Sequence, residues 1–159
     1  MYNEPQQRID RNALKAWRMS GIISSTVYML LFAIVLYLTL RFDWPVWIAL
    51  IAGAAAAVKS FLEIFLFPKL KYNQWRYEIN EHQIELRHGI IFRIRTSIPM
   101  VRIQHVDTKQ GPIMRRFGLS TVTFSTAAGS HEIPALTEQA ADQARLQIAK
   151  LARLSDEEI

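Results

Sequence analysis

The segment from 102 to 118, RIQHVDTKQGPIMRRFG, holds one histidine, one aspartate and four cationic residues around a Gly-Pro pair. A histidine beside a carboxylate is typical of acid-base catalysis, and clustered cations bind phosphate or acidic partners. His105 and Asp107 share one side of an extended strand, but no third group accompanies them. The sequence therefore predicts a structural corner rather than a catalytic site. Its charged outer edge, toward lipid or a partner, comprises Lys109, Arg115 and Arg116.

A second cationic set lies on an expected hairpin around Gly89-Ile90-Ile91. Keeping apolar residues on one face fixes the register. The predicted pairs are Leu86 with Ile94, Glu85 with Arg95, and Arg87 with Arg93. Opposed like charges are destabilising, but a lipid phosphate between them would suit the planar guanidinium fork. Arg87, Arg93 and Arg95 are thus a candidate headgroup site, unless the arginines extend into solvent or pair with acids such as Glu132.

Other chemistry is not indicated. The four histidines lie on separate segments without HxxxH spacing, so no metal site is expected. There is no cysteine, no Gly-x-Ser-x-Gly elbow and no glycine-rich phosphate loop before a helix, and the carboxylates are scattered. The pI is about 9.7, yet no expected helix is a basic recognition helix. We expect no enzyme activity, no cofactor and no nucleic acid partner.

Two apolar stretches precede these segments. Residues 19–40 contain no charge, and 22 residues suffice to cross a hydrocarbon core of about 30 Å at about 1.5 Å per residue. The run is too long for a cleaved signal peptide and lacks a small-residue cleavage site. Residues 44–67 are interrupted only by Lys59 and Glu63. Because a lysine at the bilayer centre costs about 2.5–3.5 kcal/mol, we place Lys59 near the headgroups. The sequence predicts a transmembrane hairpin over 19–67.

Flanking charges predict the orientation. Seven cationic residues flank the hairpin, and its turn carries only Arg41; the seven are Arg8, Arg11, Lys15, Arg18, Lys69, Lys71 and Arg76. Both termini are therefore expected in the cytoplasm of a cell-membrane protein. Residues 69–116 hold ten Lys and Arg against four Asp and Glu, a net charge of +6, whereas 117–159 carry −3. The basic half suits contact with the anionic inner leaflet, although a solvated positive face is an alternative.

Small residues recur on both spans. They are Ala49, Gly53 and Ala57, four apart, on the second and Gly21 and Ser25 on the first. Such residues let helix backbones approach closely, either within the hairpin or against a partner's helices. Lys59 and Glu63 could pair with each other, in the weaker orientation, or with a partner's polar residue.

From Pro68 onward the apolar residues alternate with period two. The expected strands are 75–80, 83–88, 92–98, 101–108, 119–125 and one starting at His131, with a bulge where Ile103 and Val106 break the alternation. Gly111-Pro112 starts a short turn or helix that Gly118 ends. Thr137 caps a C-terminal amphipathic helix. The class is α+β: a small antiparallel barrel closed by a helix.

The order of the motifs resembles a known family. "LRHG", "FRIRTSIP", "RIQHV", "QGPIMRRFG" and "LSTVTFSTAAG" before a terminal helix resemble the bacterial pleckstrin-homology-like domain, and the preceding hairpin resembles its YdbS-like members. The resemblance implies a pleckstrin-homology-type β-roll, a cell-membrane location and hetero-oligomeric assembly with a larger membrane protein carrying related domains. It implies no catalytic activity. The predicted organisation is a cytoplasmic tail (1–18), the hairpin (19–67), the cytoplasmic domain (68–154) and an acidic tail (155–159).

The combined expectation is a non-enzymatic membrane protein whose domain mediates assembly with that larger partner. A role in envelope stress or antimicrobial tolerance would suit such a complex. The alternative is a module that binds anionic phospholipid headgroups at the inner membrane surface.

Overall fold

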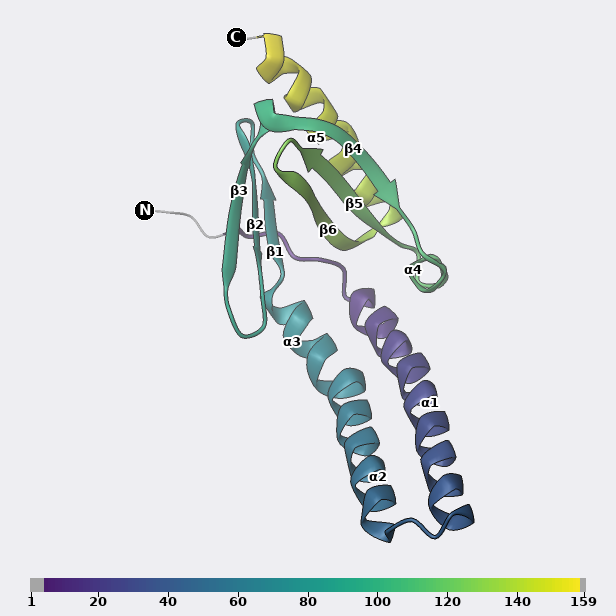
Figure 1. Ribbon diagram of the computed structural model, residues 1–159. Helices are drawn as coiled ribbons and strands as arrows, with labels where there is room; N and C mark the ends of the chain where they lie inside the picture. Colours follow the sequence, from purple (N-terminus) through teal and green to yellow (C-terminus); the bar gives the residue numbers. More distant parts are fainter. Residues whose placement is uncertain (1–4, 158–159) are drawn as a thin grey trace. The chain divides into compact units, whose positions relative to one another are not determined.

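The computed structural model describes residues 5–157, with side chains described through Leu154. Two compact units are present (Figure 1). One is helical and comprises Leu14–Lys69; the other combines the segments before and after it in the sequence. Each unit is described separately below.

The helical unit is built on two long apolar helices. Helix α1 spans Asn12–Arg41, and α2 (Val46–Phe61) continues through a π-helical turn, η1 (Leu62–Leu66), into α3 (Phe67–Gln74). Both continuous helices are long and apolar enough to cross a membrane. Helix α1 contains the predicted span 19–40 and starts seven residues before Met19. The second helix starts at Val46, two residues after the predicted start of 44–67, and continues past 67 to Gln74. The apolar side chains exposed along both helices are the kind that lipid covers in a transmembrane protein.

Small residues set the distance between the two helices. A Cβ atom at Gly21 would lie 2.7 Å from the backbone oxygen of Glu63, and one at Gly53 would lie 3.0 Å from the Phe32 ring. Ala49 is buried as well. Close backbone approach of this kind is the usual role of small residues between transmembrane helices.

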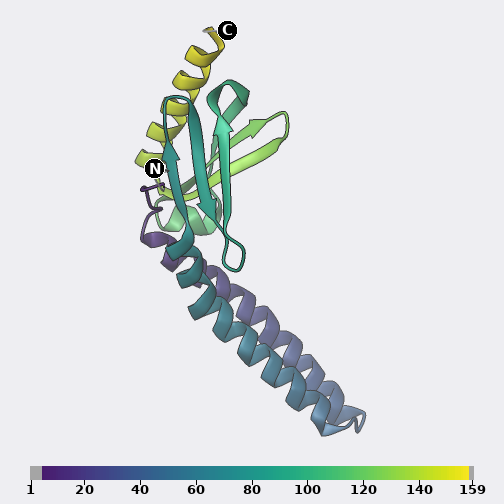
Figure 2. The same ribbon diagram turned by 90° about the vertical axis from the view of Figure 1, so that its left-hand side faces the viewer.

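The second unit contains two three-stranded antiparallel sheets and a C-terminal helix, as predicted (Figures 1 and 2). The first sheet has the order β1 (Arg76–Ile79), β2 (Gln83–His88), β3 (Ile94–Pro99). The second has the order β4 (Ile103–Lys109), β5 (Leu119–Thr126), β6 (Gly129–Thr137). A 3-10 turn, η2 (Met100–Arg102), joins the sheets, α4 (Pro112–Arg116) follows β4, and α5 spans Glu138–Glu157.

The predicted register of the β2–β3 hairpin is wrong by two residues. Strand β3 begins at Ile94 rather than Phe92, and the register pairs Leu86 with Thr96 and Arg87 with Arg95. The connection therefore runs from 89 to 93 instead of 89 to 91. Alternation alone cannot detect this slip, because a shift of two residues keeps every side chain on its face. The predicted β4 bulge is confirmed by the register shift between Ile103 and His105.

The core forms from the inward-facing residues of both sheets and from one face of α5. Helix α5 packs mainly on η2 and on the second sheet. The fully buried side chains include Ile84, Leu86, Val122, Phe124, Ile133 and Ile148. Each such burial contributes about 1.5–3 kcal/mol. The Ala140 N–H donates to the Thr137 hydroxyl at 3.2 Å, which confirms the predicted cap of α5.

Residues before α1 also belong to this unit. Gln7 and Tyr77 exchange backbone hydrogen bonds of 3.2 and 3.0 Å, and the Asp10 N–H donates to the Ala135 oxygen at 3.0 Å. Ile9 is only 2% exposed. The predicted tail 1–18 is thus divided between an edge segment of the domain and the first turns of α1, apart from residues 1–4, which lie outside the described part.

At the other end of the chain, α5 continues to Glu157, past the domain boundary predicted at 154. Residues 158–159 of the predicted acidic tail lie outside the described part of the chain.

Candidate anion-binding site

A polar cavity of about 250 Å³ lies where α3 ends, β1 begins and β2 leads into its loop. Its size falls below the roughly 300–1,000 Å³ of typical small-molecule sites. Three of its seven lining residues are arginines, and none of the described residues that line it is acidic. The lining residues are Asn73, Gln74, Arg76, Arg87, His88, Gly89 and Arg93. The cavity therefore has the dimensions and charge of a site for a small anion.

Strand register brings arginines together at this cavity. Arg87 pairs with Arg76 on one side and with Arg95 on the other, so the three form a row on one face of the sheet. Residues directly opposite in antiparallel strands have Cβ atoms about 4.5–5.5 Å apart, and like charges there are destabilising. A bound anion would offset this repulsion.

An acidic row lies one step further along the same face. Glu78 pairs with Glu85, and Glu85 Oε2 accepts from Arg95 Nη2 at 2.6 Å. This ion pair compensates Arg95, which does not line the cavity. The arginines that line the cavity are Arg76, Arg87 and Arg93.

The cavity wall is held by hydrogen bonds and ring stacking. Arg76 Nη1 donates to the Trp75 oxygen at 2.9 Å, and Gln74 Nε2 donates to the Ile90 oxygen at 3.2 Å. The His88 ring stacks on Trp75, with centroids 4.8 Å apart and an interplanar angle of 19°. Gln74 Oε1 is buried without a hydrogen-bond partner, so a ligand hydroxyl or a water could donate to it.

His88 contributes little charge at neutral pH. Burial lowers its pKa below 6.5, and the positive charges of His131 and Lys71 lower the pKa further. His88 and His131 thus interact electrostatically, which their spacing in the sequence does not predict. Within residues 5–157, no group of three His, Asp or Glu side chains converges in an arrangement that could hold a metal ion.

Gly89 allows the loop to close the cavity. Its φ of +112° is strained for any side chain, and a Cβ atom there would lie 1.9 Å from the Phe92 oxygen. Only glycine fits at this position. The five-residue connection, and with it the position of Arg93, depends on that residue.

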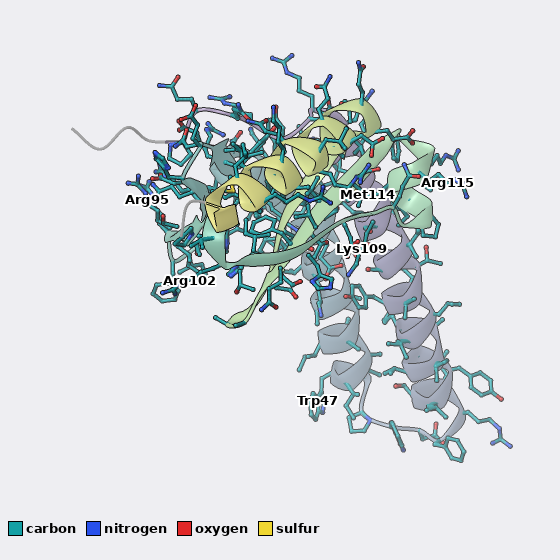
Figure 3. The ribbon with its side chains drawn as sticks, turned by 90° about the horizontal axis from the view of Figure 1, so that it is seen from above. Trp47, Arg95, Arg102, Lys109, Met114 and Arg115 are labelled. Atoms are coloured by element: carbon teal, nitrogen blue, oxygen red, sulfur yellow. The ribbon has the colours of Figure 1, made fainter. Side chains whose placement is uncertain are left out.

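The structure divides the six predicted cationic residues into two regions. Arg87 and Arg93 line the cavity, and Arg95 lies in the adjacent row. Lys109, Arg115 and Arg116 are exposed at the end of β4 and on α4. In Figure 3, the labelled Arg95 and Arg115 lie on opposite sides of the domain. Lys109, Arg115 and Arg116 form the α4 corner, and none of them lines the cavity.

Sequence reasoning missed part of the cavity. Asn73, Gln74 and Arg76 come from the junction between helix and strand, where no motif marks them. Arg76 could have been found, because placing Tyr77 opposite Leu86 on the apolar face also sets Arg76 opposite Arg87.

Polar residues of the helical unit interact with one another. The Tyr28 hydroxyl donates to Glu63 Oε1 at 2.9 Å, and Lys59 Nζ lies 4.8 Å from the centroid of the Tyr28 ring. Tyr28 thus contacts both charged residues of the predicted span 44–67, a role that sequence analysis did not give it. Each interaction reduces the cost of a charged group in a membrane span.

The predicted small-residue positions are not equivalent. Gly21 and Ala49 are buried, Gly53 is half-buried, and Ser25 Oγ donates to the Gly21 oxygen at 2.8 Å. Ala57 is exposed instead, because α2 turns its Ala52 and Ala56 side toward a shallow groove. This groove measures about 230 Å³, and its lining is Tyr28, Leu31, Phe32, Val35, Ala52, Ala55, Ala56 and Lys59.

Comparison with known proteins agrees with this architecture. The family described as "Bacterial PH domain" matches residues 16–152. The chain is also 42% identical, over all 159 residues and the full length of both proteins, to the "UPF0699 transmembrane protein YdbS" of Bacillus subtilis (strain 168). No solved structure matches it significantly. With two apolar helices preceding paired antiparallel sheets and a terminal helix, this chain belongs to the bacterial PH domain family and is a transmembrane protein.

Proposed function

We propose that the domain is a non-enzymatic module that binds the phosphate of an anionic lipid headgroup in the Arg76–Arg87–Arg93 cavity. The observation that carries the proposal is the convergence of three arginines on a small cavity whose described lining has no acid. Charge-assisted hydrogen bonds from guanidinium to phosphate are among the strongest in proteins. Gln74 Oε1 would accept a hydrogen bond from a headgroup hydroxyl.

The chain length between span and cavity supports a lipid source for the phosphate. Seven residues lead from Phe67 to Gln74, and even a fully extended chain of that length reaches only about 25 Å. The cavity is therefore tethered within reach of a membrane surface, where lipid headgroups far outnumber dissolved phosphate esters.

We further propose that the domain faces the cytoplasm. Segments on both sides of the hairpin pack in one unit, which is consistent with two membrane crossings. The basic flanks at Arg8 to Arg18 and Lys69 to Arg76, against a single Arg41 in the turn, favour a cytoplasmic domain. A cysteine at Asp43 should react with an impermeant maleimide added to intact cells, whereas one at Ala128 should react only after lysis. The reverse pattern would contradict the orientation.

Native mass spectrometry of the full chain in detergent would test headgroup binding. Retention of phosphatidylglycerol or cardiolipin should fall more than tenfold in the R87Q/R93Q variant, since each hydrogen bond to a charged group contributes about 1.5–3 kcal/mol. The R115Q/R116Q variant removes the same charge from the α4 corner and serves as the matched control.

The outcomes separate three cases. Equal losses in the two variants would reduce binding to general electrostatics and contradict the proposal. Binding of inorganic phosphate, lost only in R87Q/R93Q, without selective retention of anionic lipid would identify free phosphate as the ligand. Selective lipid loss in R87Q/R93Q alone is the expected result.

Assembly with a membrane partner is a second candidate, and the groove beside Lys59 favours it. Alanines keep this groove shallow, and Lys59 at its edge is exposed. A partner helix with an acidic residue would fill the apolar surface and neutralise the ammonium group. A photo-crosslinking residue at Ala55 should then link the chain to one membrane protein in its own cells, and the same residue at Leu50 should not. Equal crosslinking from both positions would contradict docking at the groove.

A further inference from the structure

The loop that closes the cavity exposes large apolar side chains. Ile91 is 85% exposed and Phe92 is 80% exposed, while Ile90 and Ile94 on either side are 36% and 48% exposed. Single exposed apolar residues are ordinary in folded domains, but four in a five-residue stretch form a contiguous patch that marks an interaction surface.

The same residues border an apolar hollow that adjoins the arginine cavity and shares His88 and Gly89 with it. It measures about 420 Å³, and Trp75 and His88 form part of its floor together with residues of the loop. The loop and the hollow make one apolar surface at this end of the first sheet. Figure 2 shows the loop projecting beyond the strands that it connects.

A glycine turn and a hydrogen bond constrain the loop. Gly89 supplies the left-handed turn, and the Ile90 oxygen accepts a hydrogen bond of 3.2 Å from Gln74 Nε2. A fixed loop presents Ile91 and Phe92 without a further ordering cost on binding.

Charge around the tip identifies the surface that it fits. Arg93 directly follows Phe92 and is exposed, and Arg87 lies behind the loop at the end of β2. Apolar residues flanked by cations are typical of segments that insert into an anionic membrane interface. Gln74, which is hydrogen-bonded to the loop, follows Phe67 by seven residues. Even a fully extended chain of that length keeps Gln74 within about 25 Å of the membrane span.

We propose that Ile91 and Phe92 insert into the boundary between headgroups and acyl chains of the bilayer that holds the protein. This inference goes beyond headgroup binding, because insertion depends on apolar contact with lipid chains and not on a phosphate in the cavity. It gives the β2–β3 loop the role of a second membrane contact for the domain, in addition to the helical hairpin.

The chain has no cysteine, so single labels can test insertion in the full-length protein. An environment-sensitive fluorophore would be attached to I91C and, separately, to F92C, and each protein reconstituted into phosphatidylcholine–phosphatidylglycerol vesicles without other proteins. The control is A128C, an exposed position in the β5–β6 turn. We expect blue-shifted emission at 91 and 92, with quenching by nitroxide lipids labelled near the top of the acyl chain at least threefold stronger than at 128.

Emission typical of water at 91 and 92, with quenching no stronger than at 128, would overturn the inference and leave the loop to a protein partner. The cavity and the loop can also be separated. Repeating the labelling in the R76Q background, which changes a cavity arginine that the loop argument does not use, should preserve quenching at 91. Strong quenching at 91 together with anionic lipid retention that R87Q/R93Q leaves unchanged would overturn only the headgroup site. Retention lost in R87Q/R93Q, together with quenching at 91 no stronger than at 128, would overturn only insertion.

Discussion

The arginine cavity and the α4 corner contain equal numbers of cationic side chains but use them differently. At the cavity, strand register and a tight glycine loop place Arg76, Arg87 and Arg93 around one hollow. At the α4 corner, the cationic side chains are exposed at the end of β4 and on α4, and no described cavity gathers them. Local charge density in the sequence therefore does not tell which cationic side chains share a cavity. Convergence, imposed by backbone geometry, is what distinguishes the cavity.

A glycine with a positive φ lies beside each site, Gly89 at the cavity and Gly118 at the α4 corner. Replacing each glycine by alanine should give the largest difference in stability between the two sites. At Gly89, an alanine Cβ would meet the Phe92 oxygen at 1.9 Å, whereas at Gly118 (φ +63°) it would meet nothing within 4 Å. We expect G118A to lower the free energy of unfolding by about 1–2 kcal/mol. G89A should cost more than that and abolish anion binding. Hydrogen exchange of β2 and β3 amides in the full chain would measure the difference, and equal losses of protection would contradict it.

Phosphate should stabilise the domain by binding at the arginine cavity and not at the α4 corner. A ligand that binds only the native state stabilises it by about 1.4 kcal/mol when its concentration is ten times its Kd. We expect this increase in hydrogen-exchange protection for the wild type and for R115Q/R116Q, but not for R87Q/R93Q. Sodium chloride at matched ionic strength controls for screening. Protection gained equally by all three proteins would remove the distinction between cavity and corner.

Glu85 should tune the cavity without belonging to it. The Arg95–Glu85 ion pair is partly exposed, with side-chain exposures of 41% and 13%, so its loss in E85Q should cost at most about 1 kcal/mol. The same change removes a negative charge beside the arginine row and should tighten phosphate binding about two- to fivefold. Titration of the full chain with phosphate would check this, using E138Q near the α4 corner as the control. Weaker binding in E85Q would show that Glu85 orders the arginines instead.

His88, which lines the cavity, should make the free energy of unfolding depend slightly on pH. Because its folded pKa lies below the unfolded value of about 6.5, the unfolded state binds the proton more readily. The stabilising contribution is complete above pH 6.5 and falls as the pH drops below it toward the folded pKa. H88F, which keeps a ring against Trp75, should lose this part of the pH dependence, measured by thermal unfolding. An unchanged profile would assign the dependence to other groups.

The sequence by itself determined the class of this protein. The length of the apolar stretches defined the two spans, and period-two alternation defined the strands. Thr137 and Gly111-Pro112 marked helix starts, because each of these signals is local in the chain. Even the β4 bulge followed from a local break in alternation. The sequence also named Arg87, Arg93 and Arg95 as a candidate headgroup site, and the structure places the first two at one cavity.

Tertiary structure alone decided which of those arginines converge. The length of the β2–β3 connection depends on a left-handed Gly89 and a hydrogen bond from Gln74, neither of which alternation reports, and it moved the partner of Arg87 from Arg93 to Arg95. Packing likewise drew residues before α1 against β1 and brought Tyr28 to Glu63, 35 residues apart. Periodicity assigns a residue to a face, but contacts between distant segments depend on register, turn geometry and packing, which only the folded chain fixes.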